Sequence, residues 1–284
     1  MPTVMGGVAG QILALLERLD AEAGPLPRVA SLLLPPPEAD GTHQGEFCAV
    51  ELEDGSLGLS FVLLGDTLSG LRAPADQGLA GLPALELARG YATQHGAARA
   101  LGFAAVNALT RHLYDRAGYV PASAGGSIGE LDLQPGDHVG MVGLFPPLVP
   151  QVLARGARLT VVELRAELAG PRDGWRVTLD AGELAHCDKI LSTSTVLLND
   201  TLDAVLTHCR HARRVALVGP GAGCLPDPLF ARGVTQFGGT WIVDAAAFKA
   251  ALAAGAPWGA SARKCVVTPA AYPGFDALLA AARR

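Results

Sequence analysis

The stretch VALVGPGAGCLPDPLF, residues 215–230, says most about the fold of this chain. Its first four residues, Val215 to Val218, are an apolar run typical of a buried strand. Glycines and prolines follow at once, and glycine lets the backbone approach a ligand closely because it has no Cβ atom. In a parallel α/β sheet, ligands bind at the carboxyl ends of the strands. The stretch therefore predicts a binding loop that includes Gly219, Pro220, Gly221 and Cys224.

The composition is that of a globular protein with few charges. Of the 284 residues, 50% are hydrophobic and 17% are charged, and the formal net charge is −5. No basic run resembles a phosphate-tracking surface, so we expect no nucleic-acid partner. The sequence shows no secretory signal pattern and no apolar segment of the ~18 residues that a membrane span needs. The five cysteines are an odd number without a C-x-x-C pair, which argues against a disulfide framework. We therefore expect a cytoplasmic location.

The first 120 residues predict a small α+β domain. Apolar residues recur at helical spacing near the N-terminus, and Asp54-Gly55 is a hairpin signal between two apolar runs. We expect helices at residues 8–19, 83–92 and 96–115, and strands at residues 29–34, 47–52 and 57–64.

The second half predicts a different architecture. Residues 121–135 are irregular and rich in Gly, Ala and Ser, so they are interpreted as a linker between domains 1–120 and 136–284. From residue 136 on, strands alternate with helices, which favours a Rossmann-like parallel sheet covered on both faces. We expect strands at residues 138–144, 159–163, 189–191, 215–218, 240–243 and 264–267.

Three motifs in this order resemble those of one family. The first is LGFAAVNAL at residues 101–109, and the second is STSTVLLNDTL at residues 192–202. The third begins at Val218-Gly219-Pro220 and continues to Val243-Asp244. Together they resemble the family called "putative heavy-metal chelation".

The resemblance implies both a fold and a kind of function. It implies an enolase-N-terminal-like domain followed by a Rossmann-like domain, with a site in the cleft between them. It also implies the handling of a transition or heavy metal. The chain departs from the family pattern at Gly221, where relatives often carry a hydroxyl residue.

Polar residues at other strand ends extend the predicted site. Gly143 lies in the first strand-to-helix turn of the second half, and Glu163 follows it by 20 residues, the spacing of a carboxylate that binds a ribose hydroxyl. The alternative is that Glu163 is an ordinary strand-end carboxylate. The hydroxyl residues Ser192, Thr193, Ser194 and Thr195 could bind a polar ligand or cap the helical turn that follows.

Two residues are the candidate metal ligands. Cys224 lies in the predicted binding loop, and thiolate is a soft metal ligand. The alternative is that Cys224 packs as a small hydrophobic side chain. His43 lies on a loop after three prolines, and loops carry functional residues more often than helix faces do.

These observations lead to two hypotheses about function. The first is the binding of a heavy-metal ion, a metal complex or a small metal-binding molecule in the interdomain cleft. The alternative is an enzyme that uses a nucleotide-like cofactor, NAD(P) or S-adenosylmethionine, on the Rossmann-like domain. The glycine fingerprint around Gly143 is incomplete and Pro146-Pro147 stiffens the turn, so the nucleotide ranks second. A homo-oligomer is compatible with either hypothesis.

Overall fold

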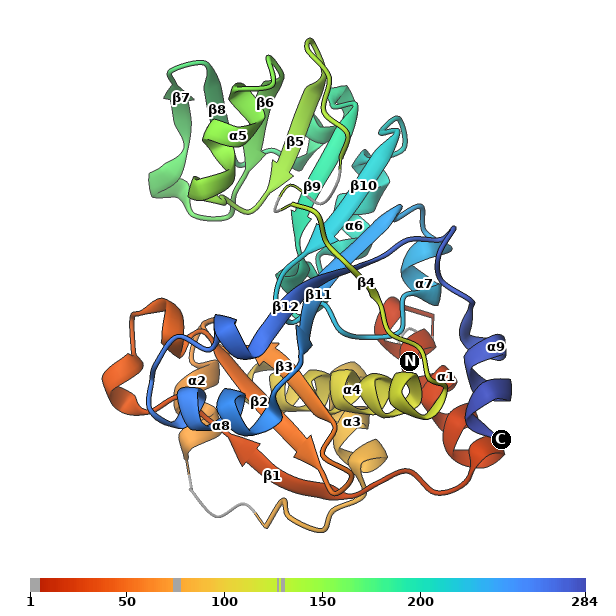
Figure 1. The fold of residues 1–284 in the computed structure, drawn as a ribbon. Coiled ribbons are helices and arrows are strands. Elements are labelled where there is room, and N and C mark those ends of the chain that lie inside the picture. The colour runs from red at the N-terminus through yellow and green to blue at the C-terminus, as the bar shows by residue number, and fades with distance from the viewer. Residues whose placement is uncertain (1–5, 74–77, 127, 129–130) are drawn as a thin grey trace.

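Two β-sheets of different kinds organise the chain (Figure 1). The structure, a computed structural model, describes residues 6–73, 78–126, 128 and 131–284. The small sheet is antiparallel and contains β1 (Val29–Leu33), β2 (Phe47–Leu52) and β3 (Leu57–Phe61) in that order. The pairing of β2 with β3 confirms the predicted hairpin.

The large sheet is mixed and has the order β4-β12-β11-β10-β9-β5-β6-β8-β7. The central strands, from β11 to β8, pair in parallel, whereas β12, β4 and β7 pair antiparallel. The predicted α/β class is therefore confirmed, with antiparallel strands added at both edges. The strands are β4 (Ala122–Ser123), β5 (His138–Val142), β6 (Arg158–Val162), β7 (Gly170–Arg172), β8 (Trp175–Thr178), β9 (Lys189–Thr193), β10 (Arg214–Val218), β11 (Gln236–Ile242) and β12 (Ala262–Val267).

Helices cover both sheets. Those in the described part of the first half include the long predicted ones, and several in the second half have only one or two turns. They are α1 (Val8–Ala23), α2 (Thr67–Arg72), α3 (Ala84–Thr93), α4 (Gly96–Arg116), α5 (Val149–Leu153), α6 (Leu202–His208), α7 (Asp227–Phe230), α8 (Ala245–Ala253) and α9 (Phe275–Ala282). No helix in the described part of the chain is long and apolar enough to cross a membrane.

Helix α4 is the central element of the lower part of the molecule in Figure 1. Its residues are buried on nearly every side, including the polar Arg99, Asn107 and His112. Two glycines permit its close packing: a Cβ at Gly58 would lie 2.1 Å from the Ala104 oxygen, and a Cβ at Gly102 would lie 2.4 Å from the Tyr91 nitrogen. The backbones of β3 and α3 therefore lie directly against α4.

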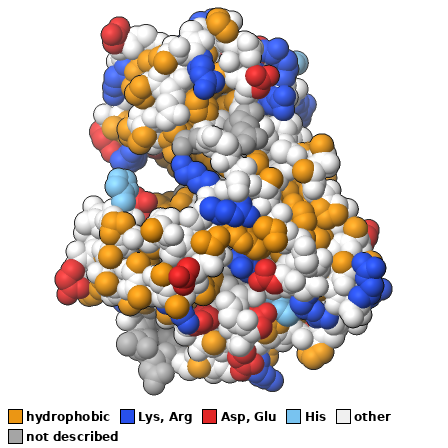
Figure 2. Space-filling view, viewed as in Figure 1, with side chains coloured by type: hydrophobic (Ala, Val, Ile, Leu, Met, Phe, Trp, Pro, Cys, Tyr) orange, Lys and Arg blue, Asp and Glu red, His pale blue; other side chains and the backbone are white. Residues whose placement is uncertain are grey.

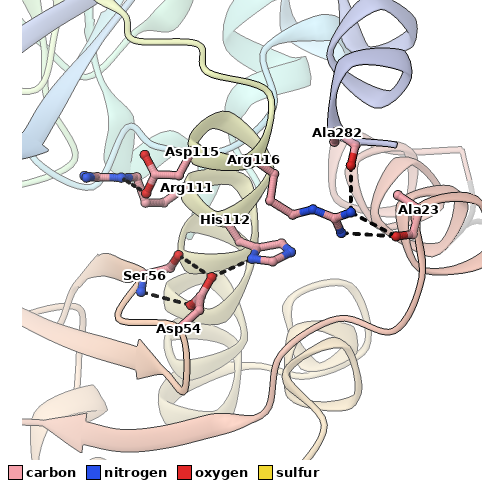
Figure 3. Close-up of polar contacts among 8 residues, drawn as sticks. All are labelled: Ala23, Asp54, Ser56, Arg111, His112, Asp115, Arg116 and Ala282. Carbon is pink, nitrogen blue, oxygen red and sulfur yellow. Dashed lines mark hydrogen bonds and ion pairs between the residues drawn. The ribbon is translucent and has the colours of Figure 1, made fainter. Parts of the chain in front are cut away.

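Polar side chains on α4 fasten neighbouring elements to it (Figure 3). Arg116 donates hydrogen bonds to the carbonyl oxygens of Ala23 and Ala282, at the ends of α1 and α9. These carbonyls lack helical partners, so the guanidinium stabilises both helix ends. His112 contacts Asp54, in the β2–β3 turn, with 2.5 Å between Nδ1 and Oδ2. Burial raises the pKa of Asp54, but hydrogen bonds from His112 and Ser56 outweigh it and hold that pKa below its ordinary value.

The end of the chain returns to the first half of the molecule. In Figure 1, α8 lies beside β1 and β2, and α9 lies beside α1. Lys249 on α8 forms an ion pair with Glu51 on β2, with 2.6 Å between Nζ and Oε1. The N-terminal and C-terminal halves are therefore interlocked.

The structure differs from the sequence expectations in three places. The β7–β8 hairpin was not predicted. Ser192 and Thr193 were expected after their strand, but they are the last residues of β9. Residues Ala122 and Ser123 of the predicted linker form β4, which pairs with β12.

We predict that Gly58→Ala destabilises the protein by about 1–3 kcal/mol or more, because its Cβ would overlap the backbone of α4. Thermal and urea unfolding measure the effect. Gly259→Ala is the control, since no atom lies within 4 Å of its Cβ position. Equal stability of the two variants would contradict the close packing of β3 on α4.

Candidate functional site

Three predicted loops meet at the carboxyl ends of neighbouring parallel strands. In the register, Val142 pairs with Ser192, and Val218 pairs with Thr193. The carboxyl ends of β5, β9 and β10 therefore lie side by side at the same end of the large sheet.

Two glycines bring these loops into contact. Gly143 has a φ of +78°, and a Cβ there would lie 3.1 Å from Thr193 Cγ2. A Cβ at Gly219 would lie 2.3 Å from Ser194 Oγ, so any larger residue would displace that serine. The structure thus brings together Gly143, Thr193, Ser194 and Gly219.

Two hydroxyl residues at these strand ends, Ser192 and Thr193, are engaged within the protein. Thr193 caps the short 3-10 helix that follows β9, because its Oγ1 accepts a hydrogen bond from the Thr195 amide. Ser192 is fully buried and donates to the Thr193 carbonyl oxygen at 3.2 Å. These contacts favour the capping interpretation over direct ligand binding.

Glu163 lies where β6 ends and stabilises the turn after β5. Its Oε2 accepts a hydrogen bond from the Leu144 amide at 3.1 Å, and its Oε1 accepts one from the Leu164 amide at 2.8 Å. Only 12% of its side chain is exposed. The carboxylate therefore holds two backbone N–H groups, and any ribose hydroxyl would have to share its oxygens.

Asn107 on α4 holds the glycine-rich loop in place. Its Nδ2 donates to the Leu59 oxygen at 2.7 Å and to the Gly221 oxygen at 2.9 Å. On the other side, a Cβ at Gly239 of β11 would lie 2.0 Å from the Ala222 oxygen. The loop is therefore clamped between α4, β3 and β11.

Two hollows adjoin this loop. The larger, which we call the strand-end hollow, has a volume of about 300 Å³, and the smaller, the inner cavity, has about 50 Å³. Pro220, Thr240 and Cys265 line both. The strand-end hollow is lined by the predicted linker and the second half of the chain, whereas the inner cavity is lined by residues of both halves. Figure 2 shows the surface hollowed between the upper and lower parts of the molecule.

The walls of the strand-end hollow are mostly apolar. They include Phe145, Pro147 and Leu148 after β5, together with Val218 and Val266. Thr240 and Lys264 supply polar groups. Neither residue was a candidate in the sequence, because a single Thr or Lys on a strand carries no recognisable pattern.

The candidate metal ligands are not brought together in a donor cluster. Cys224 is buried, and burial raises the pKa of its thiol to about 12. The side chain of His43 is 92% exposed and contacts Glu46, with 2.8 Å between Nδ1 and Oε1. Within the described residues, no group of three or more His, Cys, Asp or Glu side chains could hold a metal ion. These donors therefore do not fit a bare transition-metal ion, which needs convergent, deprotonated ligands.

We predict that Glu163→Ala lowers the free energy of unfolding by about 1–3 kcal/mol, because two backbone amides lose their charged acceptor. Glu163→Gln keeps one oxygen and should recover part of this loss. Glu167→Ala, at an exposed position nearby, is the control. Urea unfolding measures the order of stability, which should be highest for the wild type, lower for Glu163→Gln and lowest for Glu163→Ala. A Glu163→Ala variant as stable as the wild type would contradict this prediction.

A second prediction concerns the thiols. All five cysteines are buried, and burial raises their pKa values, to about 12 for Cys48, Cys209 and Cys224. The folded state favours the neutral thiol, so this stabilisation is complete below pH 9 and is lost as the pH rises towards 12. At pH 8 the native protein should react very slowly with a disulfide reagent, and five thiols should react after unfolding. One fast thiol that disappears in Cys224→Ser would contradict this account of Cys224.

Comparisons with known proteins agree with this architecture. Two family models match, both described as "Putative heavy-metal chelation", one over residues 127–270 and the other over residues 45–110. An uncharacterized protein from Methanocaldococcus jannaschii is 32% identical over 151 residues, which are 51% of this chain and 55% of that protein. The chain thus matches about half the length of this relative.

Two solved structures share the fold. Both are proteins of unknown function from the DUF364 family. The one from Desulfitobacterium hafniense has a TM-score of 0.64 at 24% identity and covers 90% of this chain and 98% of its own. The one from Pyrococcus horikoshii has a TM-score of 0.68 at 20% identity and covers 92% of this chain and 100% of its own. The family model that matches residues 127–270, about half of the chain, shows that the chain belongs to the DUF364 family, described as "Putative heavy-metal chelation".

Proposed function

We propose that the protein binds a metal complex, or a small organic molecule that binds metal, in the strand-end hollow. The observation that carries the proposal is a hollow of about 300 Å³, mostly apolar, at the carboxyl ends of β5 and β10 and beside the first five residues of β11. Small-molecule sites are typically concave, apolar and roughly 300–1,000 Å³ in volume. The family description supports metal handling in general terms.

The chemistry of the lining supports a complex rather than a bare ion. Phe145, Leu148 and Val266 offer apolar surface to an organic body and no donor atom to a metal. The ligand would therefore bring its own donor atoms. Many organic chelators carry negative charge, and the Lys264 ammonium in the lining would offset such a charge.

The alternative, a nucleotide-dependent enzyme, has weaker support from the same edge. Gly143 and Glu163 are placed at the ends of β5 and β6, as in dinucleotide-binding sheets. However, Pro146 and Pro147 carry no N–H groups for a pyrophosphate. Glu163 already accepts two backbone hydrogen bonds.

Native mass spectrometry with elemental analysis tests the proposal on protein purified without a metal-binding tag. We expect a metal and an organic mass to be retained together. Ala124→Trp should remove both, because Ala124 lines the strand-end hollow and a larger side chain would fill it. Ala122→Trp is the control, since Ala122 is exposed and lies two residues away, in β4.

Two outcomes would contradict the proposal. One is a metal retained without an organic mass and unaffected by Ala124→Trp. The other is protein that carries neither and takes up no nickel or copper during dialysis, with or without citrate.

We further predict no measurable binding of NAD, NADP or S-adenosylmethionine at millimolar concentration, as judged by calorimetry. The reason is the lack of N–H groups at Pro146 and Pro147. Micromolar binding of any of these, abolished by Glu163→Ala, would favour the enzyme instead.

A further inference from the structure

The side-chain amide of Asn107 forms hydrogen bonds through its nitrogen but not through its oxygen. Its Nδ2 uses both hydrogens, on the carbonyl oxygens of Leu59 and Gly221. Rotating the amide by 180° would place its oxygen against these two carbonyl oxygens. The orientation is therefore fixed, and Oδ1 is the atom left over.

Asn107 Oδ1 is a buried acceptor that the protein does not satisfy. The residue is 4% exposed, and Oδ1 has no hydrogen-bond partner within the described structure. Buried polar atoms are nearly always paired, so an orphan such as this one requires an explanation. A donor from outside the chain would supply one.

Space for such a donor exists beside the amide. Asn107 lines the inner cavity of about 50 Å³, and one water molecule needs about 10–15 Å³ on this measure. Gly223 keeps this space open: a Cβ there would lie 3.3 Å from Asn107 Cγ and 3.5 Å from Oδ1. The cavity therefore has room for a group of a few heavy atoms beside the Asn107 side chain.

The other walls of the inner cavity define what would fit. Tyr114, Phe237 and Trp241 provide aromatic surface. Arg111 brings a positive charge, with its guanidinium 3.8 Å from the centre of the Trp241 ring and hydrogen-bonded to Asp115. No Asp or Glu is among the described lining residues, so a cationic group would meet Arg111 without a carboxylate in the wall. An anionic group would meet the partial negative charge of Oδ1.

We propose that the inner cavity binds the uncharged N–H or O–H group of a small molecule, which donates a hydrogen bond to Asn107 Oδ1. This site is distinct from the strand-end hollow and requires no metal. The cavity recognises the ligand by the ligand's one donor group and by flat apolar contact with the aromatic walls.

Pyrrole and furan test this directly, because the two rings have nearly the same size and only pyrrole carries an N–H donor. Binding to the metal-free wild-type protein is measured by NMR titration of the Asn107 side-chain NH₂ and Gly223 amide signals. We expect pyrrole to bind about tenfold more tightly than furan. Equal affinities would overturn the proposal.

A blocking variant separates this site from others. Gly223→Ala places a methyl group beside Oδ1 and is compatible with the backbone, since the φ of Gly223 is not positive. It should reduce pyrrole affinity to that of furan while the fold is retained. Gly259→Ala, with no atom within 4 Å of its Cβ position, should bind as the wild type does.

Each outcome of these binding experiments leads to a different conclusion. Pyrrole binding that survives in folded Gly223→Ala would overturn the proposal. Should Gly223→Ala fail to fold, the pyrrole and furan comparison on the wild-type protein decides alone. Because both probes are metal-free, failure of the metal-complex proposal leaves this result unchanged, and the reverse also holds.

Discussion

The double hydrogen bond donated by Asn107 is the contact on which the site depends. One amide on α4 holds a carbonyl of β3 and a carbonyl of the glycine-rich loop, which come from different halves of the chain. The contact is short because Gly58 lets β3 lie against α4 and Gly239 lets the loop lie against β11. Both hydrogen bonds are buried, so losing them would leave two carbonyl oxygens unsatisfied at a substantial energetic cost. The shape of both hollows follows from this clamp, because Pro220 lines each of them.

Further contacts join the two halves of the chain into one structure. Helices α8 and α9 return to the first half, where Lys249 pairs with Glu51 and Arg116 holds the last carbonyl of α9. The strand ends of the large sheet therefore face a surface formed by the first half of the chain. A ligand at this edge would meet rigid apolar walls and a few polar groups, which suits recognition of an organic molecule. The buried thiol of Cys224 then contributes packing, since burial keeps its pKa near 12.

Much of the fold could be predicted because its signals are local. The β2–β3 hairpin follows from Asp54-Gly55 between apolar runs. Asp is a favoured N-cap residue, and Asp244 caps α8 by accepting a hydrogen bond from the Ala247 amide. The β7–β8 hairpin was missed because strands of three and four residues carry too little periodicity to recognise. For the site, the glycine loop and Gly143 could be located from strand ends. The tertiary partners could not: nothing local shows that Glu163 caps the turn at Leu144, or that Asn107 Oδ1 lacks a donor. Those facts arise from contacts between residues far apart in the chain.

Hydrogen–deuterium exchange of Asn107→Ala against the wild-type protein tests the central claim most directly. The account predicts faster exchange in the loop at residues 219–225 and in β3, the two segments that the amide joins, with unchanged exchange in β6 and β8. These distant strands serve as an internal reference, since Asn107 does not contact them. Exchange that increases only within α4, with the loop and β3 protected as before, would contradict the claim that this one amide holds the site together.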